Sequence, residues 1–297
     1  MKKDQASSTA FTVAQGVLYI AKHTPHARLV SDEMKTATQQ ILSATEEGQR
    51  RLRLLQSVIF PRLVPLIERL TLPGITLNYV LRKSYIQTCV QQAIDEGAQQ
   101  VIVLGAGFDT LAFRYAKKYP EVNFIEIDHP ATHIVKREAL ESATGQLKNL
   151  HFIPVDFTTQ RLEDVLSASP LAQPELPTVI TIEGVLMYLT VEQVQHLFAS
   201  LPIFLHNGRR VVFTATNPGA TTFGPLLRIY LKLKAEPLKW TCDKNEMEAF
   251  VNAAGYEFKQ LAGVPEFKEA FFPNDSRRKL NEVEYVAVAD KDWATAP

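Results

Sequence analysis

The sequence predicts an α/β protein built on a doubly wound, Rossmann-like parallel sheet. From residue 100 onward, short runs rich in Val and Ile alternate with helical stretches, and the connections between them are short. The preceding residues, 9–98, carry helical signals and no convincing strand. A Gly-x-Gly turn at Gly105 and Gly107 follows the first apolar run and precedes a helix, which is where sheets of this kind bind their ligands.

The composition is that of a globular protein with a sizeable core. Hydrophobic residues make up 46% of the 297 residues and charged residues 22%. The 32 basic and 32 acidic residues balance, so nucleic acid is not an expected partner. Two cysteines, Cys89 and Cys242, form no disulfide framework, Asp4 and Gln15 interrupt any signal peptide, and no stretch reaches the roughly 18 apolar residues of a membrane span. We therefore expect a cytoplasmic protein without a membrane partner.

Residues 1–98 are expected to form an N-terminal helical cap that belongs to the same domain as the sheet. The stretch 31–60 consists of helix formers, with acids near its start and bases near its end. Three prolines then break the pattern into short pieces, at Pro61, Pro65 and Pro73. Residues 78–97 return to helical spacing and stop at Gly97.

Residues 99–297 are expected to form the sheet and its covering helices. The expected strands are, in order, "VIVLGAG", "VNFIEID", "LHFIPVDF", "TVITIEGVLMYL", "RRVVFTATNP" and "VEYVAVAD". The helices between the first five are "TLAFRYAKKY", "ATHIVKREALESA", "QRLEDVLSA" and "VEQVQHLFASLPIFL". Two further helices are expected before the last strand. The region around 219–250 is interpreted as a lid over the site, with an ordinary surface helix as the alternative.

Asp109 distinguishes the glycine turn from a dinucleotide-binding fingerprint. That fingerprint has a third glycine three residues after the second, where this chain has Thr110. Asp109 also stands at the start of the helix whose N-terminal dipole would hold a pyrophosphate, and a fixed carboxylate there opposes a dianion. A second role for Asp109, as the N-cap of that helix, is compatible with the first.

Acids at the ends of the second and third runs predict that a nucleoside binds. Asp128 ends the second run, at the distance from Gly105 at which an acid accepts hydrogen bonds from a ribose diol. Asp156 and Phe157 end the third run, where a carboxylate can accept from the adenine amino group while the ring packs on the base. The alternatives are a helix cap before Pro130 for Asp128, and a cap and a core residue for the other two.

Two charged residues in apolar surroundings predict that the other end of the ligand carries charged groups. Glu183 lies inside the apolar run "TVITIEGVLMYL", where a carboxylate is costly unless a cation such as a ligand ammonium pairs with it. Arg82, in "YVLRKSYI", can bind a carboxylate bidentately, and its alternative is a structural salt bridge. A ribose, an adenine, an ammonium, a carboxylate and no phosphate together describe S-adenosyl-L-methionine.

The sequence resembles the leucine carboxyl methyltransferase-like O-methyltransferases in "VIVLGAGFDTLAFR", "FIEIDHPATHIVKRE", "PVDF" and "IEGVLMYLT", with "LRKSYIQ" upstream. These segments cover most of residues 78–195. The resemblance implies a class I methyltransferase fold with an N-terminal helical cap and inserted lid helices. It also implies contacts with S-adenosyl-L-methionine by Arg82 and Glu183 at the methionine end, Gly105 at the turn, Asp128 at the ribose, and Asp156 with Phe157 at the adenine. We count Ala106, Gly107 and Asp109 with the same cofactor site.

The chain departs from the pattern of this family in the stretch that begins at Arg82. Members often read Arg-Thr-Arg-Phe-Ile-Asp, whereas residues 82–87 here read Arg-Lys-Ser-Tyr-Ile-Gln. Only Arg82 and Ile86 therefore match the family pattern. A basic residue in the first helix of family members usually helps to hold the cofactor carboxylate. Lys22, in "VLYIAKHT", is a looser match for that residue.

The predicted reaction is methyl transfer to a carboxylate or hydroxyl oxygen, with a small molecule preferred as acceptor. No local pair of nucleophile and base stands out, which suits a catalyst that works by positioning. Tyr188 is placed nearest the methyl group as a guide for the acceptor, and a core tyrosine is its alternative. No metal site is expected, because Pro130 separates His129 from His133 and no further ligand is nearby.

Three alternative functions stay open at this stage. The acceptor is the C-terminal carboxylate of a protein in one of them. A nicotinamide-dependent oxidoreductase would share the fold and Asp128, although it should lack Asp109 and has no use for Glu183. A non-catalytic sensor would keep the nucleotide fold as a binding module.

Overall fold

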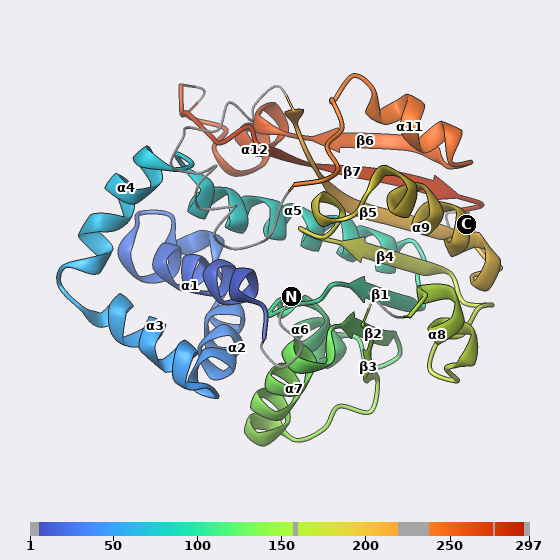
Figure 1. Ribbon diagram of the computed structural model, residues 1–297, viewed down its shortest axis with the longest axis horizontal. Coiled ribbons are helices and arrows are strands. Elements are labelled where there is room, and N and C mark those ends of the chain that lie inside the picture. The colour runs from blue at the N-terminus through green and yellow to red at the C-terminus, as the bar shows by residue number, and fades with distance from the viewer. Residues whose placement is uncertain (1–5, 157–159, 219–237, 276, 294–297) are drawn as a thin grey trace.

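A computed structural model describes residues 6–156, 160–218, 238–275 and 277–293. Its centre is a seven-stranded sheet in the order β3-β2-β1-β4-β5-β7-β6 (Figure 1). The strands are β1 (Gln100–Leu104), β2 (Asn123–Asp128), β3 (Leu150–Pro154), β4 (Thr178–Ile182), β5 (Arg209–Thr216), β6 (Glu257–Ala262) and β7 (Glu284–Lys291). The first five are parallel, and β7 pairs antiparallel with both β5 and β6.

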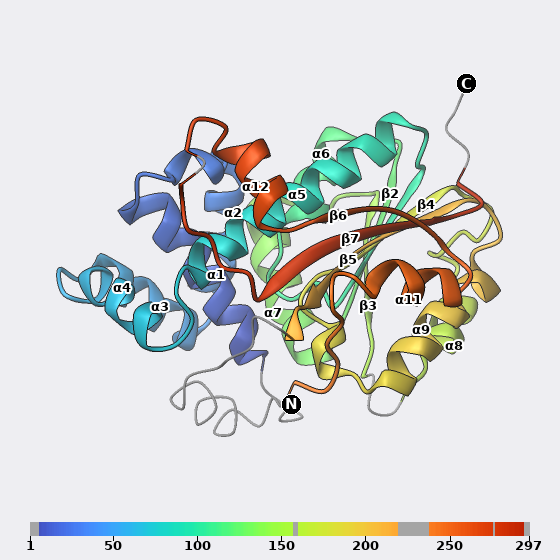
Figure 2. The same cartoon turned by 90° about the horizontal axis from the view of Figure 1, so that it is seen from above.

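The central strands of the sheet are buried on both faces, and their side chains alternate between two cores. Every residue of β1, β4 and β5 is buried, as expected for central strands with helices on either side. In β1, Val101 and Val103 belong to one core, and Ile102 and Leu104 to the other. Figure 2 shows α5 and α6 on one side of the sheet and α8, α9 and α11 on the other.

The helices after β1 connect the strands or cover the sheet. They are α6 (Leu111–Lys118), α7 (Pro130–Thr144), α8 (Leu162–Ala168), the 3₁₀ turn η2 (Leu186–Tyr188), α9 (Val191–Phe204), α11 (Met247–Ala253) and α12 (Val264–Phe271). The five parallel strands have their carboxyl ends at one edge of the sheet. The loops after β1, β2, β3 and β4 therefore meet at that edge.

The N-terminal helices form a cap at one end of the sheet (Figures 1 and 2). They are α1 (Ser8–His23), η1 (Ala27–Leu29), α2 (Asp32–Ser43), α3 (Glu46–Gln56), α4 (Phe60–Leu70) and α5 (Ile75–Asp95). Ser7, Ser31 and Thr45 cap α1, α2 and α3 by accepting from backbone N–H groups at 3.1–3.2 Å. Helix α5 packs on both α1 and the strands β5 and β7. This double contact supports the proposal that residues 1–98 are a cap within a single domain.

The structure agrees with the predicted α/β class and differs from the predicted elements in several places. Pro65 lies inside α4 instead of ending a helix, and Pro61 occupies its first turn, where no N–H is needed. The apolar run 178–189 is not one strand, because β4 ends at Ile182 and Gly184 adopts a φ of 66° before η2. The sequence pattern missed β6 and α12. An edge strand with exposed polar residues lacks the apolar run that marks a central strand. Residues 219–237, most of the predicted lid, and Phe157 lie outside the described residues.

Candidate functional site

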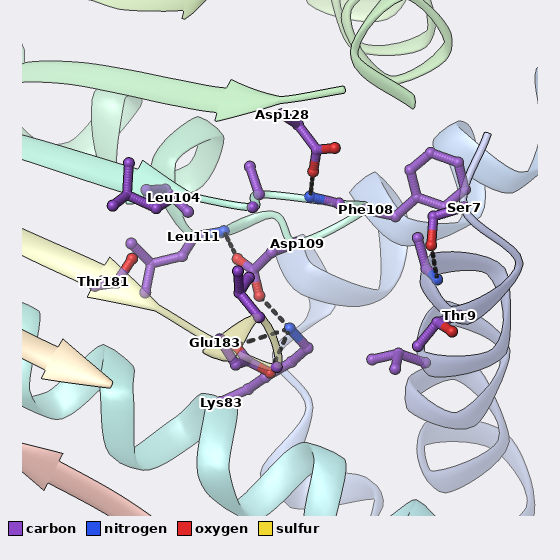
Figure 3. Close-up of a pocket in the computed structure, with 18 of the residues that line it drawn as sticks. Ser7, Thr9, Lys83, Leu104, Phe108, Asp109, Leu111, Asp128, Thr181 and Glu183 are labelled. Atoms are coloured by element: carbon purple, nitrogen blue, oxygen red, sulfur yellow. Dashed lines mark hydrogen bonds and ion pairs between the residues drawn. The ribbon is translucent and has the colours of Figure 1, made fainter. Parts of the chain in front are cut away.

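A cavity of about 530 Å³ opens at the carboxyl ends of β1, β2, β3 and β4. Its floor comes from the loops after these strands, and α1 and α2 of the cap contribute its apolar wall. The wall includes Val13, Val17 and Met34. Figure 3 shows how the labelled residues converge from the turn after β1, from the end of β2, from the segment after β4 and from α5. The volume lies in the range of small-molecule sites, so the cavity is the candidate ligand site.

The turn after β1 brings the backbone of two glycines and one alanine close to the cavity. Gly105 has a φ of 66°, and a Cβ on it would lie 2.2 Å from Cγ2 of Val185. The amide of Gly105 donates to the Ile127 carbonyl at 2.8 Å, which fixes the turn against β2. Ala106 and Gly107 continue the turn and also line the cavity. A residue with a side chain at position 105 would fit neither the backbone nor the space.

Asp128 holds the turn from the end of β2. One of its carboxylate oxygens accepts from the amide of Gly107 (Figure 3), and the other accepts from the amide of His129. The N-cap of α7 is His129, so the helix-cap alternative for Asp128 is not what the structure contains. Burial raises the pKa of Asp128, and the two backbone hydrogen bonds oppose that rise.

Asp109 occupies the beginning of α6. Its Oδ1 accepts from the amide of Leu111 at 2.6 Å, which uses a backbone donor that a bound phosphate would need. Its Oδ2 pairs with the ammonium of Lys83. Burial opposes ionisation of Asp109, but Lys83, Lys136 and the amide of Leu111 together outweigh burial and lower the pKa of this carboxyl. The helix terminus is therefore already filled by an anion of the chain itself.

A buried ion-pair network lies beside the turn. Arg82 and Lys83 are neighbours on α5, and both reach Glu183: Nε of Arg82 lies 2.9 Å and Nζ of Lys83 3.0 Å from its Oε1. Arg82 also pairs with Glu284 at the start of β7. Burial would lower the pKa of Arg82 and Lys83, but their carboxylate partners outweigh burial and raise it. With Asp109, three carboxylates face two cations, so the network carries one uncompensated negative charge.

The structure therefore contains the salt bridge that the sequence left as the alternative for Arg82. A contact of Arg82 or Glu183 with a cofactor remains a prediction. Asp156 and Tyr188 also line the cavity, Asp156 at the end of β3 and Tyr188 at the end of η2. Lys22 does not line it: this side chain is exposed on α1, and its Nζ lies 3.5 Å from Oε1 of Gln39.

Sequence reasoning missed several charged residues of the site. Lys83 follows Arg82 in an apolar stretch, and a second charge there was a signal that could have identified it. Glu284 gave no signal, because only the fold brings β7 to α5. Arg114 and Lys239 also line the cavity. Arg114 donates from Nη1 to Oε1 of Gln87 at 2.8 Å, on the α5 side of α6.

Comparisons with known proteins agree with the fold and identify a family. The family model for leucine carboxyl methyltransferase matches residues 10–201. Over 219 residues the chain is 27% identical to YktD of Bacillus subtilis (strain 168), named as an S-adenosyl-L-methionine-dependent methyltransferase, and the match covers 71% of each chain. It is also 27% identical over 256 residues to tRNA wybutosine-synthesizing protein 4 of Homo sapiens, covering 75% of this chain and 36% of that protein.

One solved structure, of a Thermobifida fusca protein assigned as a methyltransferase, superimposes with a TM-score of 0.58 at 16% identity. The superposition covers 92% of this chain and 100% of the other. At this level of identity the likeness concerns the fold, which is that of class I methyltransferases.

Proposed function

The chain belongs to the leucine carboxyl methyltransferase family and uses S-adenosyl-L-methionine as its cofactor, and from this premise we propose that it methylates a carboxylate oxygen of a small molecule. The cofactor assignment is supported mainly by the electrostatics of the cavity. Asp109 fills the helix terminus where a dinucleotide needs free N–H donors, and Glu183 of the adjoining network presents a carboxylate to the cavity. A sulfonium cofactor with no phosphate suits both features.

The residues around the cavity suggest how the cofactor is held. We assign the ribose to Asp128 and the adenine to Asp156, both at strand ends that line the cavity. Glu183 is assigned to the cofactor ammonium, and Arg82 to its carboxylate. The bound cofactor supplies a methyl group on a positively charged sulfur. The task of the chain is then to align the acceptor oxygen and exclude water.

A carboxylate acceptor is favoured over a hydroxyl by the titratable groups around the cavity. A hydroxyl needs a base within hydrogen-bond reach, whereas a carboxylate is already ionised at neutral pH. Among the described lining residues, His129 is the one histidine, and its Nδ1 accepts from the amide of Ala131 at 3.3 Å. Arg114 and Lys239 are lining cations that suit an acceptor anion. The apolar wall from α1 and α2 suits the remainder of a small acid.

The test is a labelled-methyl transfer assay with three groups of acceptors: small apolar carboxylic acids, the matching alcohols, and peptides with a free C-terminal carboxylate. We expect label in the acids and its release as methanol in mild alkali, because methyl esters hydrolyse and ethers do not. Tyr188→Phe should lower turnover while the affinity for S-adenosylhomocysteine stays unchanged. Alkali-stable label in the alcohols would replace the carboxylate proposal with a hydroxyl one. Label in the peptides alone would assign the acceptor to a protein.

A further inference from the structure

Helix α4 and the two residues before it expose an aliphatic surface far from the cavity. Val58 and Ile59 are each 69% exposed. Four residues of α4, Leu63, Leu66, Ile67 and Leu70, are between 43% and 53% exposed. No residue of α4 is buried, although the structure describes this helix completely. We call residues 58–70 the α4 surface. A cluster of large aliphatic side chains on a helix that packs so little is unusual for a surface facing only water.

The apolar side chains share one face of α4, and the opposite face attaches the helix to the cap. Residues 59, 63, 66, 67 and 70 have the spacing that places them in a single stripe. On the other side, Val64 packs against the core. Both carboxylate oxygens of Glu68 accept from backbone amides, of Gly74 at 3.2 Å and of Thr76 at 3.0 Å. In both views α4 lies at the outer edge of the cap, where a broad flat surface can reach it (Figures 1 and 2).

The exposed charges of the α4 surface all have one sign. Its exposed charged residues are Arg62 and Arg69, since Glu68 is engaged with the start of α5. Residues 58–70 include no Ser, Thr, Asn or Gln, so the exposed hydrogen-bond donors of the surface are the two guanidinium groups, which favour an anionic partner. A partner must therefore be apolar over its extent and anionic at its edge.

We propose that the α4 surface docks onto an anionic lipid bilayer, with the aliphatic stripe among the acyl chains and the arginines at the headgroups. A short amphipathic helix with basic residues beside its apolar face has the chemistry of an interfacial membrane helix. No described helix is long and apolar enough to cross a membrane, so α4 would lie in the plane of the interface. This proposal replaces the expectation from the sequence that a membrane is not a partner.

Two other occupants suit the charges less well. If two copies paired their α4 helices antiparallel about a two-fold axis, Arg62 and Arg69 of both copies would lie along the same edge, and the surface has no free carboxylate to pair with them. The segment 219–237 of the chain itself contains Arg228, Lys232 and Lys234 against a single acid, so it too carries the same sign of charge.

The test is flotation of the full-length protein with vesicles of phosphatidylcholine alone and with an equal mixture of phosphatidylcholine and phosphatidylglycerol. We expect binding to the mixed vesicles that weakens about tenfold or more in Leu66→Glu/Leu70→Glu, because burial of each leucine is lost. Arg62→Gln/Arg69→Gln should weaken it roughly fivefold for each charge removed. The matched control is Ile203→Glu, which changes a side chain 68% exposed on α9, across the sheet from the cap, and should bind like the wild type.

Three results would overturn the proposal. The first is a wild type that binds neither vesicle, or a Leu66→Glu/Leu70→Glu variant that binds as the wild type does. The second is a dimer, detected by light scattering, that this double variant dissociates, which would assign the surface to a second copy. The third is binding to the mixed vesicles that Ile203→Glu weakens as much as Leu66→Glu/Leu70→Glu does, which would show that the added negative charge, and not the loss of the α4 surface, reduces binding.

Discussion

Arg82 lies between two carboxylates, and only one of them lines the cavity. Glu183 follows β4 and contributes to the lining, whereas Glu284, at the start of β7, is 5% exposed and does not. Both hold the guanidinium by ion pairs in a buried setting, where loss of one partner leaves an uncompensated charge. Separate variants of Glu183 and Glu284 can therefore distinguish a loss of stability from a loss of ligand binding.

We predict that Glu183→Gln weakens binding of S-adenosylhomocysteine by about 2 kcal/mol, as expected for removing a charged partner from a desolvated site. Glu284→Gln is the matched control: it also removes a carboxylate from Arg82 and should lower the free energy of unfolding while leaving the affinity nearly unchanged. Calorimetric titration and urea denaturation of both variants provide the two readouts. Equal losses of affinity in the two variants would contradict the assignment of Glu183 to the ligand.

The residues of the site differ in how far the sequence could indicate them. Glu183 and Asp128 were predictable because an acid in or directly after an apolar strand needs a partner there, and Asp109 because a carboxylate at the start of a helix opposes a bound phosphate. That Lys83 is this partner for both Asp109 and Glu183 depends on α5 lying across the strand ends, which no local pattern encodes. The predicted roles of these acids toward a cofactor are untested by the fold.

At the scale of elements, the turn after β1 combines two requirements in one residue. Gly105 has a backbone conformation that residues with a side chain rarely adopt. The space beside it is filled by Val185, from the segment after β4. The cavity floor thus depends on the close approach of two loops. A sequence pattern showed the first requirement, since glycine follows a strand and precedes a helix, but could not show the second.

We predict that Gly105→Ala lowers the free energy of unfolding by more than the cost of the backbone conformation alone. Gly74→Ala measures that cost, about 1–2 kcal/mol, because Gly74 has a φ of 74° and no atom within 3.4 Å of an added Cβ. Combining Gly105→Ala with Val185→Ala, which removes the clashing Cγ2, should recover part of the excess. Urea denaturation checks all three. Losses of the same size in Gly105→Ala and Gly74→Ala would show that the contact with Val185 is unimportant.

A buried ion pair joins β2 to α7 and predicts a pH dependence. Nζ of Lys136 lies 2.6 Å from Oε2 of Glu126, and both side chains are almost fully buried. Burial raises the pKa of Glu126 to about 7 despite Lys136. Between its ordinary value of 4.5 and about 7 the folded state binds the proton more tightly than the unfolded state does. The contribution of Glu126 to the free energy of unfolding therefore falls as the pH rises through this window.

We predict that Glu126→Gln removes this contribution, so the difference in unfolding free energy between variant and wild type changes between pH 5 and pH 7. The comparison with the wild type is needed because His133, whose pKa burial lowers to about 4, has the opposite effect: its contribution rises with pH from about 4 to 6.5. Denaturation curves at several pH values provide the measurement. Parallel pH profiles for the two proteins would contradict the assigned pKa shift.

At the scale of the whole molecule, α5 connects the cap to the sheet and to the site. It packs on α1 and on β5 and β7, and it contributes Arg82 and Lys83 to the cavity. The alternation of strands and helices after residue 100 predicted the class of the fold because parallel strands need helical crossovers. The antiparallel pairing of β7 and the strand β6 were not predictable from that alternation, since pairing at the sheet edge depends on contacts distant in sequence.

Calorimetric titration distinguishes a phosphate-free adenosyl cofactor in the cavity from a dinucleotide. The purified protein is titrated separately with S-adenosylhomocysteine and with NADH, and both titrations are repeated with Asp128→Ala. We expect saturable binding of S-adenosylhomocysteine alone, weakened in the variant because the carboxylate assigned to the ribose is lost. Binding of NADH and not of S-adenosylhomocysteine would rule out this cofactor site, because a pyrophosphate would then occupy the helix terminus that Asp109 fills.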